Sequence, residues 1–165
     1  MTTYNPKINA SGYWGDYLKD GSDENMAVDG SSTPVEYLYT VPAGHTLEIQ
    51  RFMVTLEDGS VAFVPGDFGA IGGALTNGVE ISVTNSGAKY TLATWKTNRQ
   101  IRDTMFDFNP TFKADGAYVG RWTLSKDMES GITLEPGDKV SALVQDALNA
   151  LDFFSIRVKG RLRAK

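Results

Sequence analysis

Residues 35–57 read VEYLYTVPAGHTLEIQRFMVTLE, and this stretch decides the fold. Residues 35–41 are mostly β-branched and aromatic, which is typical of a β-strand. The Pro42-Ala43-Gly44 sequence that follows predicts a tight reversal, because Pro fixes φ and Gly accepts conformations that other residues avoid. Residues 46–57 then predict a second, longer strand.

The second strand carries a change of phase. Its apolar residues alternate in two sets of opposite parity: Leu47 and Ile49, then Phe52, Val54 and Leu56. One extra residue near Gln50 or Arg51 restores a single apolar face, so a β-bulge is predicted there. Such a bend suits a strand that curves around the corner of a sandwich.

The rest of the chain continues in short segments separated by turn residues. Residues 58–78 hold six glycines and predict a long loop with one short strand near residues 61–64. Residues 79–83 and 89–95 flank Asn85-Ser86-Gly87 and predict a hairpin. Residues 97–104 fit a helical turn or a loop, and residues 146–151 fit one helical turn. Further strands are expected at residues 117–124, 132–134, 139–145 and 153–161.

Strands at this spacing, without a long helix, predict an all-β fold, an antiparallel β-sandwich of the jelly-roll kind. VPAGHTLEI (41–49) resembles LEPGDKVSAL (134–143) in layout, which suggests two related hairpins in two similar halves. Residues 1–34 are rich in Gly, Ser, Asp and Asn and lack a strand period. We expect them to form an extended N-terminal arm, ordered by contact, on a body formed by residues 35–165.

The composition excludes several kinds of active site and metal site. The chain of 165 residues has no Cys and a single His, which excludes disulfides, thiolate zinc sites and cysteine nucleophiles. His45 lies beside a turn and is interpreted as a solvated turn residue. The HExxH, GxSxG, Walker A and GxGxxG motifs are absent from the sequence. We therefore expect a protein that is not an enzyme and that uses no cofactor or metal.

An acidic segment offers one alternative to that expectation. It contains four carboxylates that could supply oxygen ligands to Ca²⁺: Asp20, Asp23, Glu24 and Asp29. Their spacing does not match an EF-hand loop, so a solvated acidic loop is the preferred interpretation.

The charge is unevenly distributed. The net charge is −4, yet residues 157–165 carry five cations, so the remainder of the chain is strongly acidic. The basic tail suits an acidic protein surface, nucleic acid, a neighbouring copy of the chain or solvent alone. Overall charge argues against general nucleic-acid binding. The lack of a long apolar run or a signal peptide predicts a soluble protein without a membrane partner.

Three segments carry a resemblance to a known family: YLKDGSDENMAVDGSSTPVEYLYTVPAGHTLEIQRF (17–52), ALTNGVEISV (74–83) and RWTLSKDMESGITLEPGDKVSALVQDALNALDFFSIRVKG (121–160). Together they resemble small structural proteins of tailed bacteriophages over roughly residues 11–160. Where a second acidic residue is expected after Asp146, this chain has Ala147. The resemblance implies a virion component made in the host cytoplasm.

Within that family, the composition favours a head decoration, or cement, protein on the capsid surface. The expected partner is the major capsid protein, bound by a homotrimer at local three-fold positions. The arm is expected to supply the contacts, with aromatic anchors at Tyr4, Tyr13, Trp14 and Tyr17 and acidic contacts from Asp20, Asp23 and Glu24. Avidity from many weak contacts would then stabilise the shell.

Two other functions fit the sequence. A tail or baseplate component could use the same fold. A carbohydrate-binding module would read host glycans through exposed aromatic residues such as Trp95 or tyrosines.

Overall fold

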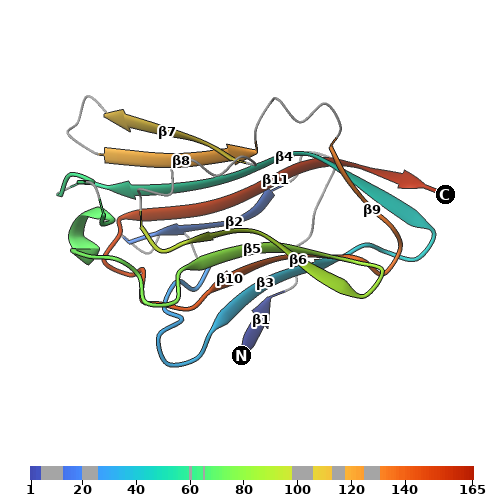
Figure 1. Cartoon of the computed structure of the whole chain (residues 1–165), viewed down its shortest axis with the longest axis horizontal. Coiled ribbons are helices and arrows are strands. Elements are labelled where there is room, and N and C mark those ends of the chain that lie inside the picture. The colour runs from blue at the N-terminus through green and yellow to red at the C-terminus, as the bar shows by residue number, and fades with distance from the viewer. Residues whose placement is uncertain are drawn as a thin grey trace.

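The computed structural model describes residues 1–4, 13–19, 26–59, 61–64, 66–97, 106–112, 118–124 and 131–165. Within these ranges the chain forms two β-sheets packed face to face (Figure 1) and no α-helix. The prediction of an all-β sandwich is confirmed. The strands are β1 (Thr2–Tyr4), β2 (Tyr13–Leu18), β3 (Val35–Thr40), β4 (His45–Asp58), β5 (Val79–Asn85), β6 (Ala88–Trp95), β7 (Phe106–Phe112), β8 (Tyr118–Leu124), β9 (Ile132–Leu134), β10 (Lys139–Val144) and β11 (Phe153–Ala164).

One sheet has the strand order β1-β3-β10-β5-β6, and the other has the order β2-β11-β4-β8-β7, with β9 paired to β4. All pairings are antiparallel except the one between β1 and β3. The pairings are nested along the chain, because β2 pairs with β11, β3 with β10, β4 with β8, and β5 with β6.

The predicted bulge in β4 is confirmed. Lys159 of β11 lies opposite Arg51, whereas the next residue, Gly160, lies opposite Ile49, so Gln50 is the extra residue. The bulge lets both apolar sets of β4 point inwards, and all five of their side chains are buried: Leu47, Ile49, Phe52, Val54 and Leu56. It also places Arg51 on the outer face of the sheet.

The core lies between the two sheets. β10 contributes Val140, Ala142 and Val144, which are fully buried, and β11 contributes the apolar residues Phe154, Ile156 and Val158. Alternation along each strand brings these residues to the inner faces, where burial of each large apolar side chain contributes about 2 kcal/mol.

The described parts of residues 1–34 are built into the sandwich. β1 extends one sheet beside β3, and β2 extends the other beside β11. Met26 and Val28 are buried in the core. The described parts of this segment thus contribute strands to both sheets and side chains to the core. The two strands escaped detection because they are short and lie at sheet edges, where one partner strand suffices and no long apolar period is required.

The two similar turns do not close hairpins, contrary to the prediction. Each turn carries the chain from one sheet to the other, between β3 and β4 and between β9 and β10. The turns lie side by side: Val41 N–H donates to Asp138 O, and Gly137 N–H donates to Val41 O, both at 2.9 Å. Their likeness thus reflects two equivalent corners of the sandwich.

Other local predictions met mixed outcomes. The expected strand near residues 61–64 is wrong, and the loop has a 3₁₀ turn over Gly69–Ile71. The helical turn expected at residues 97–104 falls outside the described residues except for Thr97. Residues 146–151 are not helical, but residues 148–151 form a turn in which Leu151 N–H donates to Leu148 O at 3.0 Å. β7 had not been predicted at all.

Candidate interaction surfaces

The predicted aromatic anchors lie within the edge strands. Tyr4 belongs to β1, and Tyr13 and Trp14 belong to β2. For these three residues the structure describes the backbone alone. Tyr17 of β2 is half-buried and packs against the chain's own core. At least part of the Tyr17 ring therefore serves the fold.

The acidic segment of the sequence is described only at Asp29. Asp20, Asp23 and Glu24 lie outside the described residues. Asp29 is described, and its Oδ1 accepts hydrogen bonds from Ser31 N–H at 3.1 Å and Ser31 Oγ–H at 2.6 Å. These bonds lower the pKa of Asp29, because they favour the charged form. This carboxylate closes its own turn, and the described part of the chain holds no cluster of three or more candidate metal ligands.

Trp95 is not an exposed sugar platform, which corrects the carbohydrate hypothesis at this position. Its side chain is 2% exposed at the end of β6. The ring makes an edge-to-face contact with Phe106 of β7, with centroids 5.2 Å apart. Trp95 therefore holds the last strands of the two sheets together.

The His45 side chain forms a hydrogen bond within its own turn. The His45 Nδ1 atom lies 3.0 Å from Ala43 O, so the tautomer protonated at Nδ1 donates a hydrogen bond there. The sequence-based interpretation as a turn residue fits this geometry.

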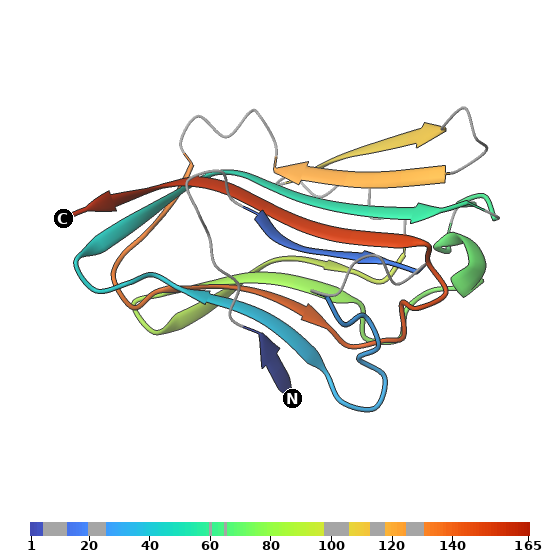
Figure 2. The ribbon, with the colours of Figure 1, turned by 180° about the vertical axis from the view of Figure 1, so that it is seen from behind.

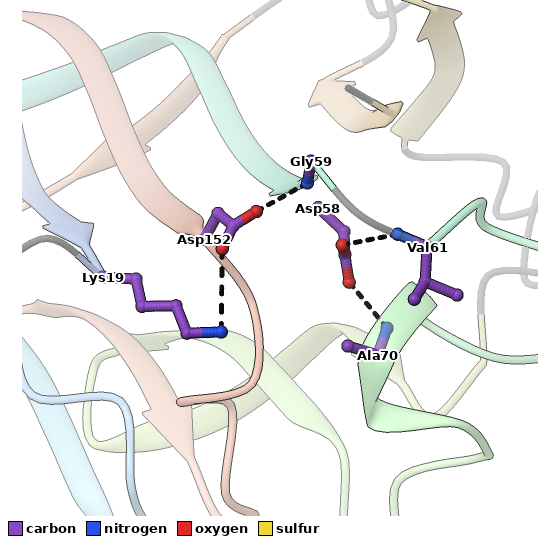
Figure 3. Close-up of polar contacts among 6 residues, drawn as sticks. All are labelled: Lys19, Asp58, Gly59, Val61, Ala70 and Asp152. Atoms are coloured by element: carbon purple, nitrogen blue, oxygen red, sulfur yellow. Dashed lines mark hydrogen bonds and ion pairs between the residues drawn. The ribbon is translucent and has the colours of Figure 1, made fainter. Parts of the chain in front are cut away.

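The loop between β4 and β5 is braced by a buried carboxylate (Figure 3). Asp58 is 1% exposed; its Oδ1 accepts from Val61 N–H at 2.9 Å, and its Oδ2 accepts from Ala70 N–H at 2.6 Å. One side chain thus fixes two points of the loop that are nine residues apart. The interaction is charge-assisted, which makes it stronger than a bond between neutral groups.

Two further carboxylates hold the same loop at its ends. Asp152, just before β11, accepts from Gly59 N–H at 2.6 Å and lies 3.7 Å from the Lys19 ammonium (Figure 3). Asp146 accepts from the backbone N–H groups of Thr76, Asn77 and Gly78, with its shortest bond, 2.7 Å, to Gly78. The loop is therefore anchored through backbone bonds along its length.

This bracing leaves apolar side chains facing solvent. Val61 is 43% exposed and Val64 is 51% exposed, and we call these two residues the loop tip. Asp67 Oδ1 accepts from Val64 N–H at 3.1 Å, which fixes the second valine as well. A pre-ordered apolar tip can bind a partner with little further loss of conformational entropy.

A second surface lies on the outer face of the six-stranded sheet. Register and alternation place six cations there, which we call the basic face: Arg51, Arg121, Arg157, Lys159, Arg161 and Arg163. Alternation along β11 had revealed four of these cations in the sequence. Arg51 was missed, because the sequence left open whether Gln50 or Arg51 is the extra residue of the bulge, and Arg121 required the pairing of β8 with β4.

Only part of the basic face is neutralised. Arg157 lies 3.4 Å from Asp16, and Arg163 lies 2.8 Å from Glu48. Four of the cations have no carboxylate within 4.0 Å among the residues that the structure describes: Arg51, Arg121, Lys159 and Arg161. The basic face thus keeps a local positive charge on a chain of net charge −4.

The loop tip and the far end of the basic face lie at opposite ends of the molecule. The 3₁₀ turn of the loop marks one end, and the C-terminus of β11 marks the other (Figure 2). β4 and β11 run side by side between them. With 14 residues in β4, the ribbon reaches up to roughly 43 Å at about 3.3 Å per residue.

One small cavity lies in the described part of the core. It is apolar, has a volume of about 10 Å³ and is lined by core residues, among them Val54, Phe68 and Trp95. Such a volume is at the lower limit for a single water molecule. No helix in the described part of the chain is long and apolar enough to cross a membrane.

Comparison of the chain with protein-family models, with curated proteins and with solved structures finds no match.

Proposed function

We propose that the protein is a virion structural protein: a capsid decoration protein that binds the head surface as a trimer and bridges major capsid subunits. The observation that carries this proposal is the placement of two chemically different surfaces towards opposite ends of one two-stranded ribbon: the loop tip, and the C-terminal part of the basic face, Lys159, Arg161 and Arg163. A protein that bridges subunits needs two separate contacts, and a stiff spacer between them.

Bridging converts weak contacts into strong attachment. Once one surface is bound, the second contact becomes intramolecular, and a trimer multiplies this effect. The apolar loop tip would supply a contact that persists at high salt, whereas the basic face would supply one that salt weakens. Two contacts of different salt dependence suit a protein that must remain on a shell under varied conditions.

The strand order supports a jelly roll for this protein. In a jelly roll, eight antiparallel strands are divided between two sheets, and first pairs with last, second with seventh, third with sixth and fourth with fifth. The pairings β2 with β11, β3 with β10, β4 with β8, and β5 with β6 follow that order. Viral capsid components commonly use this architecture, which agrees with the resemblance of the sequence to phage structural proteins.

Reconstitution on heads tests the proposal. Purified full-length protein is added to heads that lack it, and the bound copies are counted and located by electron microscopy. We expect trimers at local three-fold positions and a higher temperature of head disruption. Binding to tails or baseplates alone, or retention on a glycan array without head binding, would overturn the proposal.

A pair of matched variants tests the loop tip. Replacing Val61 and Val64 by Ser should weaken attachment to heads about tenfold or more, because each valine buries apolar surface worth about 1 kcal/mol in the contact. Tyr90→Ser is the control, because Tyr90 is 55% exposed on β6, away from the loop. Equal attachment by both variants would show that the loop tip is not part of the interface.

A further inference from the structure

Three pairs in which Asp or Asn precedes Gly lie in the part of the chain that the structure describes: Asp29-Gly30, Asp58-Gly59 and Asn77-Gly78. Such pairs are chemically weak points, because the backbone nitrogen of the glycine can attack the side-chain carbonyl carbon of the residue before it and close a succinimide ring. Glycine permits this attack best, since it has no Cβ to hinder the approach. The carboxamide of Asn reacts faster than the carboxylate of Asp, so Asn77-Gly78 is the most reactive pair of the three.

In all three pairs the glycine N–H group donates a hydrogen bond to the segment between β10 and β11, residues 145–152. Gly78 N–H donates to Asp146 Oδ2 at 2.7 Å, and Gly59 N–H donates to Asp152 Oδ2 at 2.6 Å (Figure 3). Gly30 N–H donates to the backbone oxygen of Asp146 at 3.1 Å. One short segment thus occupies the reacting N–H group of every described pair.

The Asn77-Gly78 pair is held at more than one atom. Asp146 also accepts from Thr76 N–H at 3.0 Å and from Asn77 N–H at 3.0 Å, so three successive backbone donors converge on one carboxylate. Asn77 Nδ2–H donates to Gln145 O at 3.4 Å, which restrains the side-chain amide as well. Asn77 is exposed and Gly78 is buried. Water therefore reaches the side chain, while the attacking nitrogen is enclosed.

We propose that Asn77-Gly78 is a latent deamidation site and that Asp146 keeps it unreactive in the folded protein. In the reaction, the Gly78 amide loses its proton to hydroxide and its nitrogen forms a bond to Asn77 Cγ. The bond between Cγ and Nδ2 breaks, and this nitrogen takes up a proton and leaves as ammonia. Water then opens the succinimide to aspartate or isoaspartate. Water and its ions are the only co-reactants.

Asp146 opposes this reaction in two ways. The Gly78 nitrogen must lose its proton before it attacks, and an anionic amide beside a carboxylate is disfavoured by charge repulsion. A carboxylate is far too weak a base to remove the amide proton itself. The nitrogen must also turn towards Asn77 Cγ, which requires rotation of a backbone that three charge-assisted hydrogen bonds hold. Deamidation therefore requires local opening of this segment.

Deamidation would in turn destroy the contacts that prevent it. Isoaspartate at position 77 lengthens the backbone by one methylene group and adds a negative charge beside Asp146. The three N–H groups then no longer converge on that carboxylate, at the point where the loop between β4 and β5 enters β5. We expect this end of the loop to open irreversibly. The inference goes beyond the proposed function, because it concerns the chemical lifetime of the fold whatever the protein binds.

Mass spectrometry of the aged protein tests the proposal. Full-length protein is incubated at pH 8 and 37 °C, and conversion of Asn77 is followed over time in its proteolytic peptide. A parallel incubation in concentrated guanidinium chloride gives the rate for the unfolded chain. We expect the native protein to deamidate at Asn77 at least about fiftyfold more slowly than the unfolded chain. Equal rates in the two incubations would overturn the proposal.

Two variants separate the action of Asp146 from general loosening of the loop. Asp146→Ser should raise the native deamidation rate about tenfold or more and leave the rate in guanidinium chloride unchanged, because the charged acceptor acts only in the folded protein. Asp67→Ala is the matched control, since Asp67 is a carboxylate of the same loop that accepts from Val64 N–H. It should change the rate less than twofold. A slower reaction in Asp146→Ser, or equal acceleration in both variants, would overturn the role of Asp146.

Hydrogen exchange of the unsubstituted protein keeps the proposal testable if Asp146→Ser fails to fold. Exchange of the Gly78 amide and deamidation of Asn77 require the same opening, so the two processes should be slowed by similar factors relative to the unfolded chain. Both should accelerate together as guanidinium chloride is raised below the unfolding transition. A Gly78 amide that exchanges at the unfolded rate, or a well-protected one beside an Asn77 that deamidates at the unfolded rate, would overturn the proposal.

Discussion

The two ends of the β4–β11 ribbon are stabilised in different ways. At the loop end, the carboxylate of Asp58 is 1% exposed and accepts hydrogen bonds from two backbone N–H groups. At the C-terminal end, the corresponding contacts are ion pairs at the surface: Arg163 with Glu48 at 2.8 Å, and Lys165 with Glu135 at 2.6 Å. In both pairs the cation is 59% exposed.

This difference indicates which end of the ribbon can replace its internal contacts by contacts with another molecule. Removing a buried acceptor leaves backbone donors without a partner, at a cost of about 1–3 kcal/mol for each group. An exposed ion pair contributes about 0–1 kcal/mol and is screened by salt. The loop end is therefore preformed, whereas the C-terminal end can exchange an internal ion pair for one with a partner at little cost in free energy.

The largest expected effect comes from the loop end. Asp58→Ala should lower the free energy of unfolding by about 3–4 kcal/mol, because the N–H groups of Val61 and Ala70 lose a charged acceptor. Urea unfolding monitored by tryptophan fluorescence measures the change. The same variant should weaken head attachment, since the loop tip loses its support.

Asp67→Ala is the matched control in the same loop. Asp67 accepts one bond, from Val64 N–H at 3.1 Å, and it is half-buried. Its removal should therefore cost under about 1 kcal/mol. Equal losses for the two variants would show that burial of the carboxylate is not what distinguishes the loop end.

Two glycine variants compare the two ends of the ribbon through a smaller effect on the free energy of unfolding. Gly69, in the loop, and Gly44, at the C-terminal end, have similar positive φ values of 61° and 71°. A Cβ on Gly69 would lie 2.5 Å from Asp58 Oδ2, whereas one on Gly44 would meet no atom within 4 Å. Gly44→Ala should cost about 1 kcal/mol from the backbone alone, and Gly69→Ala about 2–3 kcal/mol.

Thermal and urea unfolding of both glycine variants give the comparison directly. The excess loss in Gly69→Ala measures the close approach of the loop to Asp58. Identical losses would mean that the loop yields easily, and the loop end would then be no more rigid than the C-terminal end.

Much of this fold could be predicted from local sequence. The parity change in β4 predicted the bulge, because a sheet with one buried face tolerates no other way to keep both Ile49 and Phe52 inside. The edge strands β1 and β2 and the unpredicted strand β7 could not be identified in this way. An edge strand has one paired side, and β7 contains Pro110, which lowers its strand propensity.

The candidate surfaces were harder to predict, because each depends on contacts between distant segments. The cations of β11 alternate visibly in the sequence, but Arg121 joins them only through the pairing of β8 with β4. The bracing of the loop by Asp58 and Asp152 was equally hidden, since a carboxylate that binds backbone N–H groups carries no motif. Trp95 was misjudged for a related reason: its burial depends on Phe106, eleven residues away, in the opposite sheet.

The smallest expected effect belongs to the ion pair at the C-terminal end. Arg163→Ala should lower the free energy of unfolding by under about 1 kcal/mol in 50 mM salt, and the difference should shrink in 500 mM salt. Glu48→Gln removes the partner carboxylate and should give a similar loss, whereas the double variant should lose less than the sum, because both single changes break the same pair. A loss above about 2 kcal/mol that salt does not alter would mean that this end is held as firmly as the loop end.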